Sequence, residues 1–208
     1  SANFAPFQFV THLFMHGSLI HIFFNMFALF MFGSVLEQVL GAQRFFTYYF
    51  VAGFGAAALY LGVNYLEALS VQQDLMAAGV SQSNVTALQK ATTETELRSI
   101  LGNIDQLSAG IREQVINLYR SYNIPTVGAS GAVYGLLAGF GLLFPNTNVY
   151  LYFLFPIKAK YLVIGAGAIE LYSQLTAGPG DNIAHLAHLG GMLFGFLLLR
   201  VWGIQRFN

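Results

Sequence analysis

The sequence contains no cysteine and very few charged residues. Only 9% of its 208 residues are charged, against about 25% in an average soluble domain. Without cysteine the chain cannot form disulfide bridges or use thiol chemistry. A formal net charge of +0 leaves no excess of basic residues to neutralise phosphates. These absences exclude disulfide scaffolds and thiol enzymes, and we expect no nucleic-acid partner.

Apolar and aromatic residues make up most of the chain instead. It is 56% hydrophobic, with 22 Gly, 20 Phe and 11 Tyr, and its mean hydropathy is +0.59. This profile is typical of a multi-span membrane protein, so we expect a lipid bilayer around it. The opening SANFAPFQF has neither Met nor the basic and then apolar pattern of a signal peptide. We therefore expect no signal peptide, and we expect that the sequence begins within a longer protein.

A transmembrane helix needs about 20 mostly apolar residues, and five stretches of the chain come close to that length. They cover residues 18–36, 45–66, 127–144, 161–175 and 184–202. The fourth is short and contains Glu170, which we expect to pair within the bundle or to face the cytoplasmic interface, without a catalytic role. Glu37, after the first stretch, is interpreted as a structural residue.

The segment between the second and third stretches has a different character, because it holds most of the acidic residues of the chain. Its apolar residues recur at helical spacing around Ile111 and Val115, with Ser108 available as an N-cap. Thr93 and Glu96 have the spacing of a capping box. The segment is therefore predicted to form two or three amphipathic helices outside the bilayer core.

The basic residues outside this segment fall on one side of the membrane if the spans alternate in direction. They are Arg44, Lys158, Lys160, Arg200 and Arg206. The positive-inside rule makes that side cytoplasmic. The first, third and fifth spans then run from outside to inside, and the segment of amphipathic helices lies outside.

Polar residues gather at the outer ends of these three co-directional spans. They are His16, His21 and Asn25 in the first, Ser130 in the third, and His185 and His188 in the fifth. Polar groups within spans are costly and usually functional. Small residues at i, i+4 spacing let helix backbones approach closely, and such rows follow the serine (Gly131, Gly135, Gly139) and the histidine (Gly191, Gly195). We therefore predict that the Ser130 hydroxyl and the His188 ring lie within hydrogen-bond distance.

This pair has the chemistry of a nucleophile and its base. Serine is a poor nucleophile unless a neighbouring base takes its proton, and His188 is the candidate base. Candidate donors to an oxyanion are the side chains of His21 and Asn25 and the backbone N–H of Ser130, with Gly128 beside it. No acid is well placed to complete a triad, since Asp181 reads as a loop residue, so the sequence favours a dyad. The alternative is that Ser130 is only a small residue at a helix crossing.

Other histidines favour structural interpretations. His12 and His16 have the spacing of zinc ligands on a helix, but the HExxH glutamate is absent, and packing is favoured. For His185 we favour hydrogen bonding to a loop over assistance to His188. The sequence thus predicts neither a metal nor a cofactor.

Four motifs together resemble the rhomboid family of intramembrane serine proteases. They are His16-x4-His21-x3-Asn25, Gly128-Ala129-Ser130-Gly131, Ala187-His188-x2-Gly191-x3-Gly195 and Gly33-x3-Glu37-x3-Gly41. The resemblance runs from about residue 7 to residue 202. It implies that Ser130 is the nucleophile and His188 the general base, that His21, Asn25 and the Ser130 amide stabilise the oxyanion, and that Tyr134 stacks on His188.

The resemblance also implies a fold and a division of the chain. The fold class is an all-α membrane protein, a rhomboid-like bundle of bacterial type with five visible transmembrane helices of an expected six and a helical extramembrane insert. Residues 1–17 are an outer loop partly embedded at the interface, 18–66 two transmembrane helices, 67–126 the extracytoplasmic insert, 127–203 three transmembrane helices with the dyad, and 204–208 a cytoplasmic tail. The loop 176–182 caps the site, and the fourth span is a side gate for substrate.

Three departures from the family pattern accompany this resemblance. The span that normally precedes the outer loop is missing, so we expect a truncated chain. Phe7-Gln8 stands where the family often has tryptophan and arginine. The insert is longer than the corresponding loop of compact members.

The predicted function is an intramembrane serine endopeptidase that cleaves single-span membrane-protein substrates near the outer surface of a bacterial inner membrane. The alternative is a non-catalytic rhomboid-like protein that binds transmembrane helices, although its usual mark is loss of the serine or histidine. A small channel or transporter is disfavoured, because the chain has no internal repeat. The sequence indicates no oligomeric state.

Overall fold

A computed structural model of the chain describes residues 7–104, 107–123, 129–151, 154–176 and 184–204. The chain divides into two compact units. The large unit comprises residues 6–60 and 126–208, and the small unit comprises residues 61–125 with 1–5. The boundary falls within one long helix, α4 (Ala42–Ala77), which contributes its first part to the large unit and its last part to the small one.

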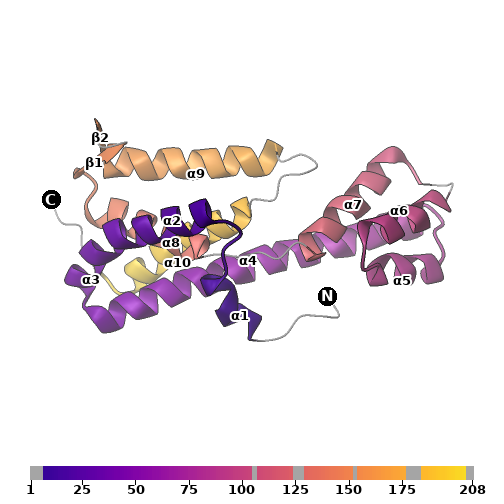
Figure 1. The fold of residues 1–208 in the computed structure, drawn as a ribbon, viewed down its shortest axis with the longest axis horizontal. Coiled ribbons are helices and arrows are strands. Elements are labelled where there is room, and N and C mark those ends of the chain that lie inside the picture. Colours follow the sequence, from indigo (N-terminus) through magenta and orange to yellow (C-terminus); the bar gives the residue numbers. More distant parts are fainter. Residues whose placement is uncertain (1–6, 105–106, 124–128, 152–153, 177–183, 205–208) are drawn as a thin grey trace. The chain divides into compact units, whose positions relative to one another are not determined.

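The large unit is a helical bundle (Figure 1). It begins with a short helix α1 (Gln8–Thr11) and a 3-10 turn (His12–Phe14). A continuous helical stretch follows, made of α2 (Leu19–Ala28), a π-helical turn (Leu29–Gly33) and α3 (Ser34–Leu40). After α4 the unit resumes with α8 (Ser130–Leu143), α9 (Ala159–Thr176) and α10 (His185–Val201). The all-α class predicted from the sequence is confirmed.

Each predicted span contains a long helix among the described residues, but one of them ends much later than expected. The second span, predicted to end at residue 66, continues as α4 to Ala77. Residues 67–77 contain neither proline nor glycine, so nothing in the backbone stops the helix there. The helix stops at Gly79, which has a positive φ of 79°. The next residue, Val80, donates its backbone N–H to the Leu75 carbonyl oxygen, which completes a glycine C-cap.

A seam of small residues brings α8 against α10 and α4. A methyl group on Gly135 would lie 3.0 Å from the carbonyl oxygen of Gly191, and one on Gly195 would lie 3.1 Å from the carbonyl oxygen of Gly135. The contacts advance together along both helices, so α8 and α10 run parallel. From α4, the buried Ala52 faces Gly135. The Tyr48 hydroxyl donates a 2.7 Å hydrogen bond to the Gly135 carbonyl oxygen.

A short hairpin interrupts the helices between α8 and α9. Strands β1 (Asn148–Leu151) and β2 (Phe155–Lys158) pair antiparallel, from Asn148 opposite Lys158 to Leu151 opposite Phe155. The sequence does not predict these strands, because they are only four residues long and lie between longer helical patterns.

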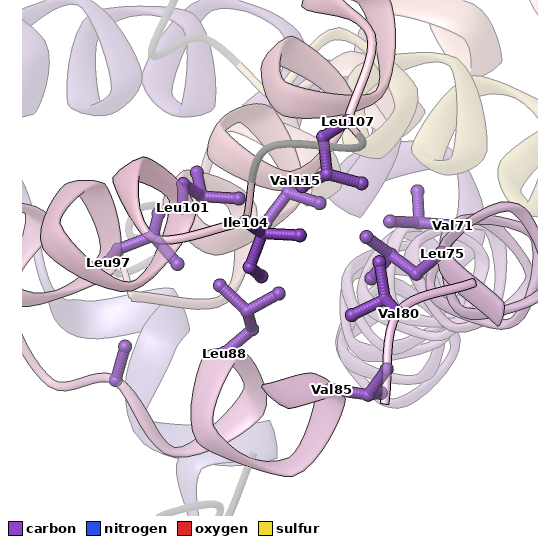
Figure 2. Close-up of a cluster of buried hydrophobic side chains, with 11 residues drawn as sticks. Val71, Leu75, Val80, Val85, Leu88, Leu97, Leu101, Ile104, Leu107 and Val115 are labelled. Atoms are coloured by element: carbon purple, nitrogen blue, oxygen red, sulfur yellow. The ribbon is translucent and has the colours of Figure 1, made fainter. Parts of the chain in front are cut away.

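The small unit consists of the end of α4 with α5 (Gln82–Lys90), α6 (Glu94–Gly102) and α7 (Ala109–Asn123). These three helices confirm the prediction of two or three amphipathic helices between the second and third spans. Figure 2 shows the apolar cluster that they share with α4, formed by Val71, Leu75, Val80, Val85, Leu88, Ala91, Leu97, Leu101, Ile104, Leu107 and Val115. All of these side chains are buried, so the unit has a core of its own.

The helices of the small unit begin at side-chain caps. Ser108 accepts a hydrogen bond from the Ile111 amide, and Thr93 accepts one from the Glu96 amide, as predicted. The Glu96 carboxylate reaches back to Thr92 rather than to Thr93, accepting from its amide at 3.0 Å and from its hydroxyl at 3.2 Å. These bonds, the one from the amide first, hold the pKa of Glu96 below its usual range.

The large unit leaves many apolar side chains on its outside. Leu19 is 87% exposed on α2, Leu175 77% on α9 and Val201 80% on α10. Among the described residues, two helices are long and apolar enough to cross a membrane, Leu19–Leu40 and Ala42–Ala77, and α8 and α10 are shorter apolar helices. A soluble protein rarely exposes so large an apolar surface.

Candidate active site

Ser130 and His188 are in direct contact in the large unit. Ser130 is the first residue of α8, and His188 lies in the first turn of α10. The Ser130 Oγ and the His188 Nε2 are 2.9 Å apart, a hydrogen-bond distance. The serine is half-buried, and the histidine is 8% exposed. The predicted approach of hydroxyl and imidazole is confirmed.

The glycine rows explain why these two helix ends meet. A methyl group on Gly131 would lie 3.3 Å from the carbonyl oxygen of Ala187, the residue before the histidine. A methyl group on Gly191 would overlap the carbonyl of Gly131. Because neither glycine has a side chain, the two backbones touch at the level of the serine and histidine.

Tyr134 holds the plane of the His188 ring. The two rings are stacked, with centroids 4.2 Å apart and an angle of 7° between their planes. Tyr134 lies one turn after Ser130 on α8. Stacking restricts rotation of the imidazole, so its Nε2 stays directed at the serine.

An acidic residue contacts the other side of the imidazole, which the sequence did not lead us to expect. Glu170 of α9 is 6% exposed, and its Oε2 lies 3.0 Å from the His188 Nδ1. The N–H direction of Nδ1 does not point directly at this oxygen, so this is a short polar contact rather than an aligned hydrogen bond. The expectation that no acid is well placed beside His188 is therefore wrong. Of the two places considered for Glu170, the structure shows the pairing within the bundle.

Two more side chains bind the same carboxylate. The His185 Nδ1 lies 2.5 Å from Oε2, and the Tyr134 hydroxyl donates to Oε1. His185 is buried at the start of α10 and contacts this acid, whereas the sequence favoured a loop as its partner. The signal was present in the sequence, because a lone acid within an apolar span is a functional residue by default.

The two candidate oxyanion side chains both lie on α2. Ser18 caps this helix by accepting a 3.1 Å hydrogen bond from the His21 amide. The His21 ring packs edge-on against His16, with centroids 5.4 Å apart, and lies near enough to His188 for the two rings to interact electrostatically. Asn25 is 5% exposed, and its Nδ2 has no hydrogen-bond partner among the described residues. A buried amide nitrogen without a partner needs an explanation, and a catalytic role is one of those available.

Some predicted elements lie outside the described residues. They are Gly128, Asp181, Arg206, the part of the predicted capping loop from residue 177 to residue 182, residues 1–6 of the outer loop, residues 105–106 and 124–126 of the insert, residues 127–128 of the third span and residues 205–208 of the tail. The predicted supporting glycines Gly131, Gly191 and Gly195 are all described, and each contacts a neighbouring helix.

Glu170, His185 and His188 also form a potential ligand set for a metal, with ligand atoms within 4.8 Å of one another. Two ligands of a tetrahedral zinc ion, each about 2.0–2.1 Å from the metal, lie about 3.3 Å apart. The 2.5 Å and 3.0 Å separations from the glutamate oxygen to the two histidines are shorter than this. The geometry is therefore that of a carboxylate contacting two imidazoles directly.

Comparison with known proteins identifies the family. The family model described as "Rhomboid domain" matches residues 3–104 and 97–204. The chain belongs to the rhomboid family. It is therefore an integral membrane protein of the rhomboid-like helical fold, which accounts for the apolar exterior of its large unit.

Curated relatives of this rhomboid are eukaryotic. It is 25% identical over 88% of its length to "Rhomboid protein 1, mitochondrial" of Saccharomyces cerevisiae, and 24% identical over 91% to "RHOMBOID-like protein 6, mitochondrial" of Arabidopsis thaliana. It is 35% identical over 40% of its length to an uncharacterized mitochondrial rhomboid protein of Schizosaccharomyces pombe. The chain spans 38%, 41% and 23% of these relatives, respectively. No solved structure matches it significantly.

These relatives bear on the predicted type and location of the rhomboid. All three carry the word mitochondrial in their names. They give no support to the prediction of a bacterial type or of a bacterial inner membrane. Membership of the family and insertion in a membrane do not depend on whether the protein is bacterial or mitochondrial.

Proposed function

We propose that this rhomboid is an intramembrane serine endopeptidase in which Ser130 is the nucleophile and His188 the general base. The observation that carries the proposal is the 2.9 Å contact between the Ser130 Oγ and the His188 Nε2. A serine hydroxyl becomes a competent nucleophile when a base accepts its proton at this distance. Family membership gives the same reaction class by analogy.

The first chemical step forms an acyl-enzyme. The Ser130 Oγ attacks the scissile carbonyl carbon while its proton passes to the His188 Nε2. The tetrahedral intermediate then collapses, and the same Nε2 gives the proton to the leaving amine. Water, activated by the same imidazole, subsequently hydrolyses the ester. The site must therefore admit water.

Donors to the developing oxyanion are available on two helices. The Ser130 N–H belongs to the first turn of α8 and has no intrahelical acceptor. The Asn25 Nδ2 is buried and has no described partner. We assign these two groups and the His21 ring to stabilisation of the oxyanion, which is the largest electrostatic term in acyl transfer.

The substrate that suits this site is itself a membrane segment. The large unit presents apolar side chains outward on α2, α9 and α10, so a polypeptide that reaches the site from the bilayer is apolar. We propose single-span membrane proteins as substrates, with entry beside α9. The active site is proposed to open on the face opposite the basic residues, as the positive-inside rule requires.

The test is cleavage of a single-span model substrate by the purified protein in detergent, combined with labelling by a fluorophosphonate probe. We expect labelling at Ser130, and we expect Ser130→Ala to abolish labelling and to reduce cleavage by about 10³-fold or more. Ser34→Ala, which removes a hydroxyl from α3, is the matched control and should retain activity. Undiminished cleavage by Ser130→Ala, or binding of the substrate without any turnover by the wild-type protein, would contradict the proposal.

A further inference from the structure

We infer that Glu170 is a positioning residue that completes a Ser130–His188–Glu170 triad, with the acid supplied in the membrane by α9. The inference rests on the proposed function and deepens it, because the sequence alone favours a dyad. Its basis is the convergence of three side chains on one buried carboxylate. That carboxylate lies on the side of the His188 ring opposite to the serine.

The contacts assign a tautomer to His188. For Nε2 to accept the serine proton, its lone pair must face the Ser130 Oγ, so the ring hydrogen must sit on Nδ1. The Glu170 Oε2, 3.0 Å from Nδ1, is the acceptor that favours this tautomer. Hydrogen bonds of catalytic groups are often poorly aligned in the resting state and tighten when charge develops. The misaligned but short contact is therefore the arrangement expected before substrate binds.

The carboxylate is itself held in place by two further donors. His185 contacts Oε2, and the Tyr134 hydroxyl donates to Oε1. Three converging donors suit an ionised carboxylate, which can accept about four hydrogen bonds. Tyr134 also stacks on His188, so the same tyrosine orients both the imidazole and the acid.

During the reaction the acid stabilises charge and takes no proton. When Nε2 receives the serine proton, His188 becomes an imidazolium with hydrogens on both nitrogens. The Nδ1–H then donates to the ionised Glu170, and the positive charge is balanced between two buried side chains. The proton leaves from Nε2 to the amine of the departing peptide, so the carboxylate is unchanged at the end of the cycle.

The deciding experiment compares Glu170→Gln with Glu37→Gln. Both variants replace a glutamate by its uncharged isostere, but Glu37 is exposed near the end of α3. For Glu170→Gln we expect kcat on the single-span model substrate to fall by about 10²–10⁴-fold with KM within about twofold, and fluorophosphonate labelling of Ser130 to slow in parallel. Glu170→Asp, which keeps the charge, should recover part of the lost kcat. Glu37→Gln should behave as the wild type.

A second measurement does not depend on activity or on a folded variant. Nitrogen NMR of histidine-labelled wild-type protein in detergent reports which ring nitrogen carries the hydrogen. We expect His188 to be the Nδ1–H tautomer, and we expect folded Glu170→Gln to lose this preference. Wild-type His188 in the Nε2–H tautomer would overturn the inference even if Glu170→Gln fails to fold.

Failure of the inference is distinguishable from failure of the proposed function. If wild-type protein neither cleaves nor labels, the proposed function fails. If the wild type is active, Ser130→Ala is inactive and Glu170→Gln keeps the wild-type kcat, only the triad fails. Loss of wild-type activity on treatment with a chelator, restored by Zn²⁺, would assign Glu170, His185 and His188 to a metal and would also overturn the triad.

Discussion

Asn25 is a buried residue for which we propose a role in catalysis rather than in folding. Its side chain is 5% exposed, and its Nδ2 makes no hydrogen bond among the described residues. Burial of an unpaired amide is unfavourable for stability. The unpaired Asn25 amide is explained if it finds its hydrogen-bond partner only in the transition state, as an oxyanion donor would.

We expect Asn25→Ala to lower kcat by about 10²–10³-fold, the usual effect of removing one oxyanion donor. Because no hydrogen bond of the Nδ2 is broken, the unfolding temperature should stay close to that of the wild type. Asn64→Ala is the matched control, since Asn64 is equally buried on α4. Its activity per folded molecule should be unchanged. Equal losses of kcat in the two variants would show that the effect belongs to buried amides in general.

The site residues that lie in or next to the sequence motifs could be predicted from the sequence, and the one that lies outside the motifs could not. Ser130, Tyr134 and His188 could be brought together from the glycine spacing and the family resemblance. Glu170 stands out in the sequence as a lone acid in an apolar span, but its contact with His188 could not be predicted, because that contact depends on the rotation of α9 about its own axis. A rotation of half a turn about that axis would move the carboxylate from the bundle to the lipid, and composition does not distinguish the two orientations.

At the scale of elements, the glycine seam between α8 and α10 is the feature on which the site depends. The two helices approach until backbone atoms touch, and this contact sets the level of Ser130 against His188. The close approach of these two helices could be predicted from the i, i+4 spacing of their glycines. The late end of α4 and the β1–β2 hairpin could not, because helix ends are decided by single caps and four-residue strands leave little periodicity.

The seam predicts opposite outcomes for two glycine-to-alanine changes in the same unit. Gly191→Ala places a methyl group on the carbonyl of Gly131, and backbone cannot move aside as a flexible side chain can. We expect a loss of about 1–3 kcal/mol or more in stability and a matching fall in the unfolding temperature. Gly165→Ala on α9 meets no atom within 4 Å, so it should cost nothing and gain slightly from helix propensity.

Thermal unfolding in detergent measures both variants, and labelling of Ser130 by a fluorophosphonate reports whether the site survives. The seam explanation requires Gly191→Ala to lose labelling as the helices separate. It would be contradicted if Gly191→Ala were as stable as Gly165→Ala and labelled at the wild-type rate.

At the scale of the whole molecule, the chain combines a membrane bundle with a small unit that has its own apolar core. The two parts could be separated in the sequence because their compositions differ: the spans are nearly free of charge, and the segment between the second and third spans holds most of the acids. The same charge distribution predicts which side of the membrane each part faces, and this prediction does not depend on catalysis.

The absence of cysteine from this chain makes that orientation directly testable, since any single cysteine introduced is the only thiol in the chain. Lys158 is exposed at the end of β2, beside the predicted cytoplasmic bases, and Gln89 is exposed on α5 of the small unit. In sealed vesicles of known orientation, a membrane-impermeant maleimide should label Lys158→Cys only from the predicted cytoplasmic side and Gln89→Cys only from the opposite side. Permeabilisation should make both accessible, which controls for burial. Labelling of both cysteines from one side would require an even number of crossings between them, and the co-directional arrangement of the spans that carry Ser130 and His188 would have to be reconsidered.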